Sequence, residues 1–208
     1  MALSTSSHKL RELYVKYCQP LTYNDLTDLA IGCGMLETIN LEGTGCLNGD
    51  GDTHEMEGSN KCNCAHNLSF SDLFGQFRNL TELNLFLCKN LHSKGLEKIA
   101  EVCENLEKLN IDEINYLSDD SINTLIYLRG DKLKMLWIDG ESLSDESFSN
   151  FEKMEKLELL SISFSDNMGA RGLASIAKLE KLGRGLLFIF YFSLPETIFR
   201  VAKITKRC

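Results

Sequence analysis

The residues best suited to metal chemistry lie in one stretch, residues 48–66, which reads NGDGDTHEMEGSNKCNCAH. Cys62, Cys64 and His66 offer two thiolates and an imidazole, which are ligands that zinc prefers. Their C-x-C spacing differs from the usual C-x₂-C of zinc knuckles, and Thr53 stands where a calcium loop needs glycine. A Gly- and Asp-rich stretch without periodicity is also typical of a projecting loop. A zinc site is therefore one hypothesis here, and a loop insertion is the simpler interpretation.

No arrangement of residues predicts catalysis. The four histidines lie near a terminus, in the 48–66 stretch or in a predicted turn, and none stands beside a repeated acid. The Gly-x-Gly sequences lack the third glycine and the strand–helix context of a dinucleotide-binding loop. The sequence therefore predicts a protein that is not an enzyme and that needs no cofactor.

Aromatic residues near carboxylates indicate a different chemistry, the recognition of another protein. Trp137 is the only tryptophan and is followed two residues later by Asp139, while Phe86 and Asp112 occupy comparable places earlier in the chain. Exposed aromatic side chains next to charges are common hot spots of protein interfaces. These residues can act together only if the fold brings them onto one surface.

A sequence repeat supplies the elements that would position them. In residues 80–105, leucines first alternate with polar residues and then recur at helical spacing, which predicts a strand followed by a helix. Neither half can bury its apolar side alone, so copies must stack. Six copies begin at Leu10, Leu36, Leu80, Leu106, Leu133 and Leu157. The one long interval between these starts contains the 48–66 insertion.

The helical halves carry their own signals. Ser118 and Ser144 precede acidic residues and predict helix N-caps, because hydroxyls and carboxylates satisfy the free amides of a first turn. By its spacing, the last helix is expected to bury Leu173, Ile176 and Ala177.

This pattern resembles the cysteine-containing class of leucine-rich repeats, which carry one cysteine after the strand and a second at the end of the helix. Cys33 and Cys103 match the second position. The first position is assigned in order to Cys18, Cys46, Cys88, Ile114, Glu141 and Ser165. The resemblance implies an α/β solenoid of about six repeats over residues 1–181, with a curved parallel sheet inside and helices outside. It also implies buried, free cysteines.

Residues 182–208 lose the repeat pattern and are expected to form a degenerate C-terminal cap or a divergent tail. Within them, residues 194–198 and 200–203 resemble parts of an F-box. The chain is thus similar to F-box leucine-rich-repeat proteins, as a fragment or isoform without an intact F-box. The resemblance implies substrate recognition for an SCF-type ubiquitin ligase. A Skp-type adaptor and cullin would bind only if a longer form carries a complete F-box.

Two alternatives remain open beside the ligase role. One is a free-standing leucine-rich-repeat adaptor or competitor, and the other is a metal-binding module formed by the 48–66 insertion. In either repeat-based function, a target protein should contact the exposed floor of the concave face, between the inward leucines. The candidate contact residues are Tyr14, Asn40, Asn84, Phe86, Asn110, Asp112, Trp137 and Asp139.

Composition limits the other function classes. The chain has 208 residues, 43% of them apolar, and a formal net charge of −8. An acidic balance disfavours binding to nucleic acid or to an anionic membrane. The longest apolar run, residues 186–192, is far shorter than the ~20 residues that a membrane span needs, and the N-terminus has no signal-peptide pattern. We therefore expect a cytoplasmic or nuclear monomer.

Overall fold

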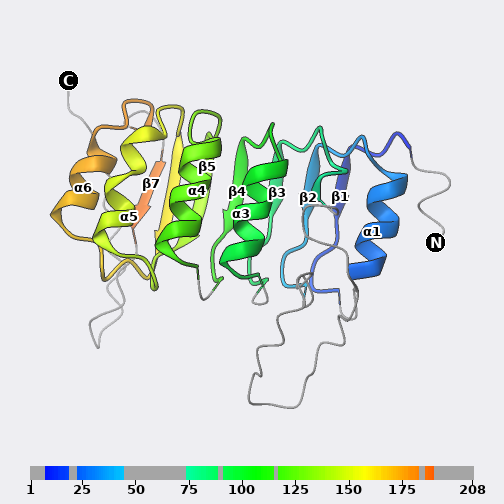
Figure 1. Cartoon of the computed structure of the whole chain (residues 1–208), viewed down its shortest axis with the longest axis horizontal. Helices are drawn as coiled ribbons and strands as arrows, with labels where there is room; N and C mark the ends of the chain where they lie inside the picture. The colour runs from blue at the N-terminus through cyan, green and yellow to red at the C-terminus, as the bar shows by residue number, and fades with distance from the viewer. Residues whose placement is uncertain are drawn as a thin grey trace, which may run out of the picture.

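The structure is a computed structural model that describes residues 8–18, 23–44, 74–88, 91–114, 117–182 and 186–189. Strands lie side by side and the helices cover one face of the sheet that they form (Figure 1). The strands are β1 Glu12–Tyr14, β2 Thr38–Asn40, β3 Glu82–Asn84, β4 Lys108–Ile111, β5 Met135–Asp139, β6 Leu159–Ser163 and β7 Leu186–Ile189. The helices are α1 Tyr23–Gly32, α3 Ser93–Val102, α4 Asp119–Arg129, α5 Asp145–Ser149, the 3₁₀ helix η1 Phe151–Lys153, and α6 Ala170–Ala177.

The described strands form one parallel sheet in chain order from β1 to β7. The register aligns the same inward position of all six predicted copies: Leu13, Ile39, Leu83, Leu109, Leu136 and Leu160. β7 adds a further strand from the region in which the repeat pattern is lost, with Leu186 paired to Leu159. The predicted α/β leucine-rich-repeat solenoid is confirmed.

The core lies between the sheet and the helices. Leu83 and Leu109 of the strands are at most 1% exposed, and Leu96 and Ile99 of α3 are fully buried. This agrees with the two periodicities of the sequence, because alternate strand positions and one stripe of each helix meet in the same layer. Within the described part of the chain, no helix has the length and apolar character needed to cross a membrane.

Two predicted N-caps are present. The Ser118 hydroxyl accepts a hydrogen bond from the Ser121 amide at the start of α4, and the Ser144 hydroxyl accepts one from the Ser147 amide at the start of α5. Each satisfies an amide that has no partner within its helix.

The first residue of each of three helices also holds the start of the next helix. Ser93 Oγ accepts a hydrogen bond from the Ser118 amide at 2.8 Å, and Asp119 Oδ1 accepts one from the Ser144 amide at 2.9 Å. Asp145 Oδ1 accepts hydrogen bonds from the amides of Gly169 and Gly172, both at 2.8 Å, at the start of α6. These amides, that of Gly172 foremost, lower the pKa of Asp145. We call this series of contacts the helix-start relay.

The last helix is rotated relative to the prediction. Leu173 is 38% exposed and Ala177 is also exposed, whereas Gly172, Ser175 and Ile176 are buried. A Cβ at position 172 would lie only 2.6 Å from Phe148 Cβ. α6 therefore approaches α5 through a glycine, and this close contact turns Leu173 outward.

The cysteine positions differ from the prediction in two repeats. Thr44, not Cys46, takes the first position of the second repeat, because Thr44 follows Asn40 at the interval that separates Cys88 from Asn84. In the fifth repeat Gly140 takes this position and Glu141 is exposed. The turn there is one residue shorter, since the Leu143 amide bonds to the Gly140 carbonyl as the Leu91 amide bonds to that of Cys88.

The described cysteines are free thiols. Cys33, Cys88 and Cys103 are buried, as expected, but Cys18 is exposed. The Cys88 thiol donates to the Leu41 carbonyl at 3.1 Å. Burial raises the pKa of Cys88, and it raises that of Cys103 to about 12. Cys88 and Cys103 are therefore protonated packing residues with little nucleophilic character.

Candidate functional site

Two rows of side chains cross the strands on the side of the sheet away from the helices, and together they form what we call the strand face. The middle row consists of Tyr14, Asn40, Asn84, Asn110, Trp137 and Ser161, which are aligned by the sheet register. The end row lies two residues later, where the strands finish, and consists of Lys16, Glu42, Phe86, Asp112, Asp139 and Ser163. All eight predicted contact residues belong to these rows.

The three asparagines of the middle row stabilise the turns that follow their strands. Asn40 Oδ1 accepts a hydrogen bond from the Glu42 amide at 3.0 Å. Asn84 Oδ1 accepts one from the Phe86 amide at 2.9 Å, and Asn110 Oδ1 accepts one from the Asp112 amide at 3.1 Å. Side-chain oxygens that bond to the backbone two residues later are typical of such turns. The amide oxygens are thus occupied within the fold.

Two of the predicted contact residues are not exposed. Asn40 is only 8% exposed and Asp139 only 5%, so the expectation that both lie on an open floor is wrong. Asn40 is held by its own turn. Ser163 Oγ donates to Asp112 Oδ2 at 3.1 Å, and this contact joins the residues on both sides of Asp139 in the end row. Asp139 is thereby enclosed between its neighbours.

The fifth repeat departs from the asparagine pattern. Trp137 replaces the asparagine, and β5 continues for two residues beyond it. Asp139 Oδ1 then accepts a hydrogen bond from the Glu141 amide at 2.8 Å. The carboxylate of Asp139 thus accepts the turn hydrogen bond that an asparagine side-chain oxygen accepts in repeats two to four.

The two end-row carboxylates are electrostatically unusual. Burial raises the pKa of Asp112, and the Ser163 hydroxyl and the Glu113 amide oppose this shift. Burial is also the main reason that the pKa of Asp139 is raised to about 6, and the charge of Asp112 adds to it. No Lys or Arg among the described residues forms an ion pair with either carboxylate.

The remaining acid of the two rows is paired, because Lys16 Nζ lies 2.9 Å from Glu42 Oε2. Two residues before the middle row, Lys108 Nζ lies 2.9 Å from Glu82 Oε2. These cross-strand pairs were not predicted from the sequence, although aligning the copies places the partners side by side. Tyr17 was not predicted either; it is 60% exposed and donates a hydrogen bond to Glu42. Within the two rows, the acids that form no ion pair with a described residue are therefore Asp112 and Asp139, at the ends of β4 and β5.

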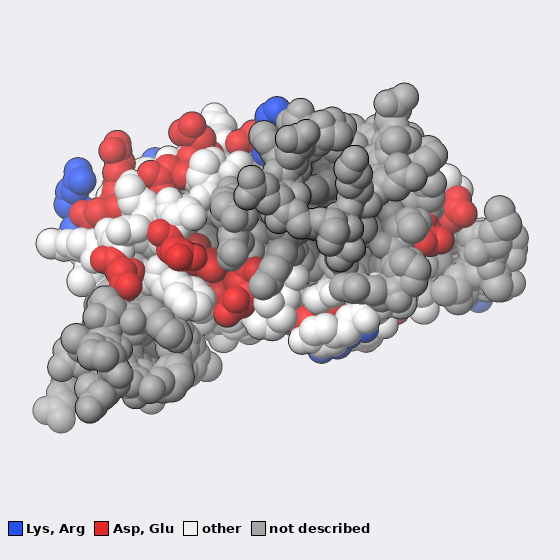
Figure 2. Space-filling view, turned by 90° about the horizontal axis from the view of Figure 1, so that it is seen from below, with Lys and Arg blue, Asp and Glu red and all other residues white. Residues whose placement is uncertain are grey.

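Figure 2 shows the molecule from below, which is the edge toward which the strands point in Figure 1. Asp and Glu side chains gather on the part of this edge that the structure describes. The aromatic contact residues beside it differ in exposure: Tyr14 is 58% exposed, while Phe86 and Trp137 are half-buried.

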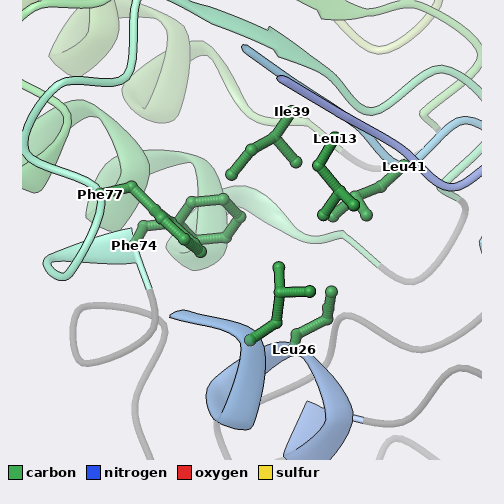
Figure 3. A pocket seen from close by; sticks show the side chains of 7 residues that line it. Leu13, Leu26, Ile39, Leu41, Phe74 and Phe77 are labelled. Atoms are coloured by element: carbon green, nitrogen blue, oxygen red, sulfur yellow. The ribbon is translucent and has the colours of Figure 1, made fainter. Parts of the chain in front are cut away.

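An apolar pocket lies between the first repeats, away from the strand face. The side chains of α1, β1 and β2 point toward those of the 74–77 segment (Figure 3). The lining residues are Leu13, Leu26, Leu29, Ile39, Leu41, Phe74 and Phe77. Because none of them carries a polar side-chain group, the pocket offers no catalytic or orienting chemistry.

The candidate zinc ligands Cys62, Cys64 and His66 lie outside the described residues, as do the whole 48–66 insertion and the F-box-like residues 194–198 and 200–203. Within the ranges that the structure describes, no three His, Cys, Asp or Glu side chains are grouped so as to hold a metal ion. The zinc hypothesis stays a prediction.

Comparison with known proteins identifies the repeat. A leucine-rich-repeat family model matches residues 78–100, which include β3 and most of α3. The chain thus contains a leucine-rich repeat within its solenoid. No curated protein matches it in sequence.

Several solved structures are similar in fold. An internalin, InlF, from Listeria monocytogenes has a TM-score of 0.54 and 18% identity over 89% of this chain and 44% of its own. A chain of the yeast Rad7 and Elc1 complex has a TM-score of 0.47 and 16% identity over 88% of this chain and 56% of its own. This chain therefore spans less than two thirds of either relative. The internalin supports the same α/β solenoid fold.

Proposed function

We propose that this chain is a protein-interaction module that binds a target protein on the strand face, over β3 to β5. The observation that carries the proposal is the carboxylate of Asp112, which has no basic partner among the described residues and lies in the same row as Phe86. Trp137 lies on the next strand. Such a surface combines apolar anchors with negative charge, and it suits a basic, partly apolar segment of another protein.

The proposed surface differs from the predicted one. Asn40 and Asp139 are removed from it because they are buried, and Asn84 and Asn110 contribute mainly through their NH₂ groups because their oxygens bond to the backbone. Phe86, Asp112 and Trp137 are the main contact residues that remain over β3 to β5, and Tyr14 is exposed on β1, outside this surface.

A finer form of this proposal is target recognition for an SCF-type ubiquitin ligase. Its support is the resemblance of the sequence to F-box leucine-rich-repeat proteins. This role requires a longer form with a complete F-box that brings in a Skp-type adaptor and cullin. Co-precipitation tests it: a longer form should retain the adaptor, whereas this chain alone should not. If no form retains the adaptor, the chain acts as a free-standing adaptor or competitor.

The binding surface is tested with a partner obtained from an unbiased screen. Trp137→Ala should weaken its affinity by about 2 kcal/mol, or about 30-fold in Kd, if Trp137 is an anchor. Asp112→Asn should mainly slow association and reduce the dependence of the rate on salt. Tyr127→Ala is the matched control, because Tyr127 is an aromatic residue on α4 that is 86% exposed. A partner that ignores Trp137 but is lost on deletion of residues 48–66 would contradict the proposed surface.

A further inference from the structure

Among the described residues, one side of the backbone of the first strand has no partner. β1 pairs with β2 and is the last strand of the described sheet on the N-terminal side (Figure 1). The Arg11 carbonyl accepts hydrogen bonds from the amides of Glu37 and Thr38, and the Val15 amide donates to the Asn40 carbonyl. In a parallel ladder, every second residue directs both its N–H and its C=O group toward the same neighbouring strand, so Arg11, Val15 and the residue midway between them face β2. The intervening residues direct theirs the other way.

Those intervening residues are Glu12, Tyr14 and Lys16. No described residue bonds to their backbone N–H or C=O groups. An edge of this kind is a template for pairing with another strand.

The core is also less completely buried at this end of the described sheet. Leu13 and Val15 of the first repeat are only partly buried, whereas the equivalent Ile39 and Leu41 of the second repeat are at most 2% exposed. A partly exposed core surface of a solenoid needs a further layer to cover it. Tyr14, on the strand face beside this edge, is 58% exposed.

The order of residues along β1 makes the edge complementary to itself. In an antiparallel pair centred on Tyr14, Glu12 of one copy lies opposite Lys16 of the other, and two-fold symmetry repeats this contact. Glu12, Tyr14 and Lys16 are then the hydrogen-bonded positions of the ladder, and Leu13 lies opposite Val15 on the core side. Opposite charges directly across an antiparallel pair are stabilising.

We propose that two copies of this chain associate through their β1 edges as an antiparallel pair centred on Tyr14, and so form one continuous sheet. The existing contacts of the charged residues are compatible with this arrangement. Lys16 bonds to Glu42, and its ammonium group has three N–H donors, so it can also bind Glu12 of the second copy. This proposal replaces the expectation of a monomer and is independent of the target-binding proposal. Because the edge is short, the dimer should be weak and dependent on concentration.

Charge reversal on the full chain tests the proposal. Glu12→Lys and Lys16→Glu each place like charges opposite one another in the homodimer, and each should raise the dissociation constant, measured by sedimentation equilibrium, by about tenfold or more. Mixing the two variants restores opposite charges at both positions, so the mixture should form a heterodimer. The double variant Glu12→Lys with Lys16→Glu should dimerise about as well as the wild-type chain. Circular dichroism of each variant verifies that the repeat array is folded.

Amide hydrogen exchange locates the contact. The amides of Glu12, Tyr14 and Lys16 should become protected as the protein concentration rises. A chain that stays monomeric into the high micromolar range would overturn the proposal, and so would self-association that is unaffected by the charge variants. Protection of these amides at concentrations where the chain is monomeric would also overturn it, because another part of the same chain would then cover the edge.

Discussion

The turns that follow the strands differ between two regions of the strand face. In repeats two to four, strands of three or four residues carry an asparagine at the last or last-but-one position, and its side chain bonds to the following turn. In repeats five and six, the strands have five residues, and Trp137 and Ser161 stand in place of the asparagine. The first region uses its polar side chains to hold its own backbone. The second places the aromatic residue Trp137 and the carboxylate of Asp139 where those turns would be.

This difference separates structural polar groups from those available for binding. An asparagine that recurs in register is occupied by its turn, and two acids beside these asparagines, Glu42 and Glu82, are paired with lysines of adjacent repeats. The end-row carboxylates without an ion pair among the described residues are Asp112, in the last asparagine repeat, and Asp139, in the first repeat without the asparagine. Recognition chemistry is therefore best sought at the boundary between the two regions.

The largest expected effect comes from breaking the strand that joins the two regions. Leu109 of β4 is fully buried, so Leu109→Asp should lower the free energy of unfolding by about 4 kcal/mol or more, because the charge has no partner in the core. Urea denaturation followed by circular dichroism measures this. Both regions should unfold together, and a variant that keeps one folded region would show that they are independent units.

Asp139→Asn is expected to have a smaller effect of opposite sign, an increase in the free energy of unfolding. Because its folded-state pKa is about 6 and its ordinary value is 3.8, folding disfavours the carboxylate, and this cost disappears as the pH falls from about 7 to 4. Asp139→Asn keeps an oxygen for the Glu141 amide and removes the charge. It should raise the free energy of unfolding by about 2 kcal/mol at pH 8 and have little effect at pH 4.

The control is Asp112→Asn, which should stabilise less, because Asp112 is more exposed than Asp139 and because the hydrogen bond from the Ser163 hydroxyl stabilises its charged form. Equal destabilisation by Asp139→Asn at both pH values would mean that the carboxylate is needed for its shape or bonding and not penalised for its charge.

The contrast between repeats two to four and repeats five and six can be tested by truncating the same middle-row position in one repeat of each region. Asn84→Ala removes the acceptor for the Phe86 amide and should cost about 1 kcal/mol of unfolding free energy. Ser161→Ala removes a hydroxyl that makes no side-chain hydrogen bond within the described residues, and should cost about 0.5 kcal/mol or less. Thermal denaturation of the two variants measures these losses. Similar losses of unfolding free energy for both variants would contradict the distinction between the regions.

The smallest effect is expected from the cross-strand ion pair. Lys108 and Glu82 have side chains about 40% exposed, and exposed pairs contribute little. Lys108→Ala should therefore change the free energy of unfolding by about 0.5 kcal/mol or less, and the change should shrink further in high salt. A larger, salt-resistant loss would show that the pair also supports the Asn110 turn on the same strand.

Much of the fold was predictable because the same pattern of apolar residues occurs in every repeat. The inward positions of Leu83 and Leu109 follow from a period that recurs six times, and the caps at Ser118 and Ser144 follow from local chemistry. Cys46 and Glu141 were misassigned because the repeats differ in length at a turn, and sequence spacing alone does not show where residues are lost. The outward rotation of Leu173 depends on a contact between Gly172 and Phe148 that helical periodicity does not encode.

The candidate site was predictable in outline only. Alternation along the strands identified the rows, and Phe86, Asp112 and Trp137 are at least partly accessible. The burial of Asp139 could not be predicted, because it depends on Ser163 reaching Asp112 across an intervening strand. The internal role of Asn40 likewise depends on the turn that follows it.

The helix-start relay gives the array a direction. Ser93, Asp119 and Asp145 each hold the beginning of the following helix, so each of the last three repeats finds the acceptor for the start of its helix on the repeat before it. During synthesis the ribosome releases the repeats in the same order. Each of these helices can therefore begin at a hydrogen-bond acceptor that has already folded. The repeats can then fold in order from the N-terminal to the C-terminal end before synthesis of the chain is complete.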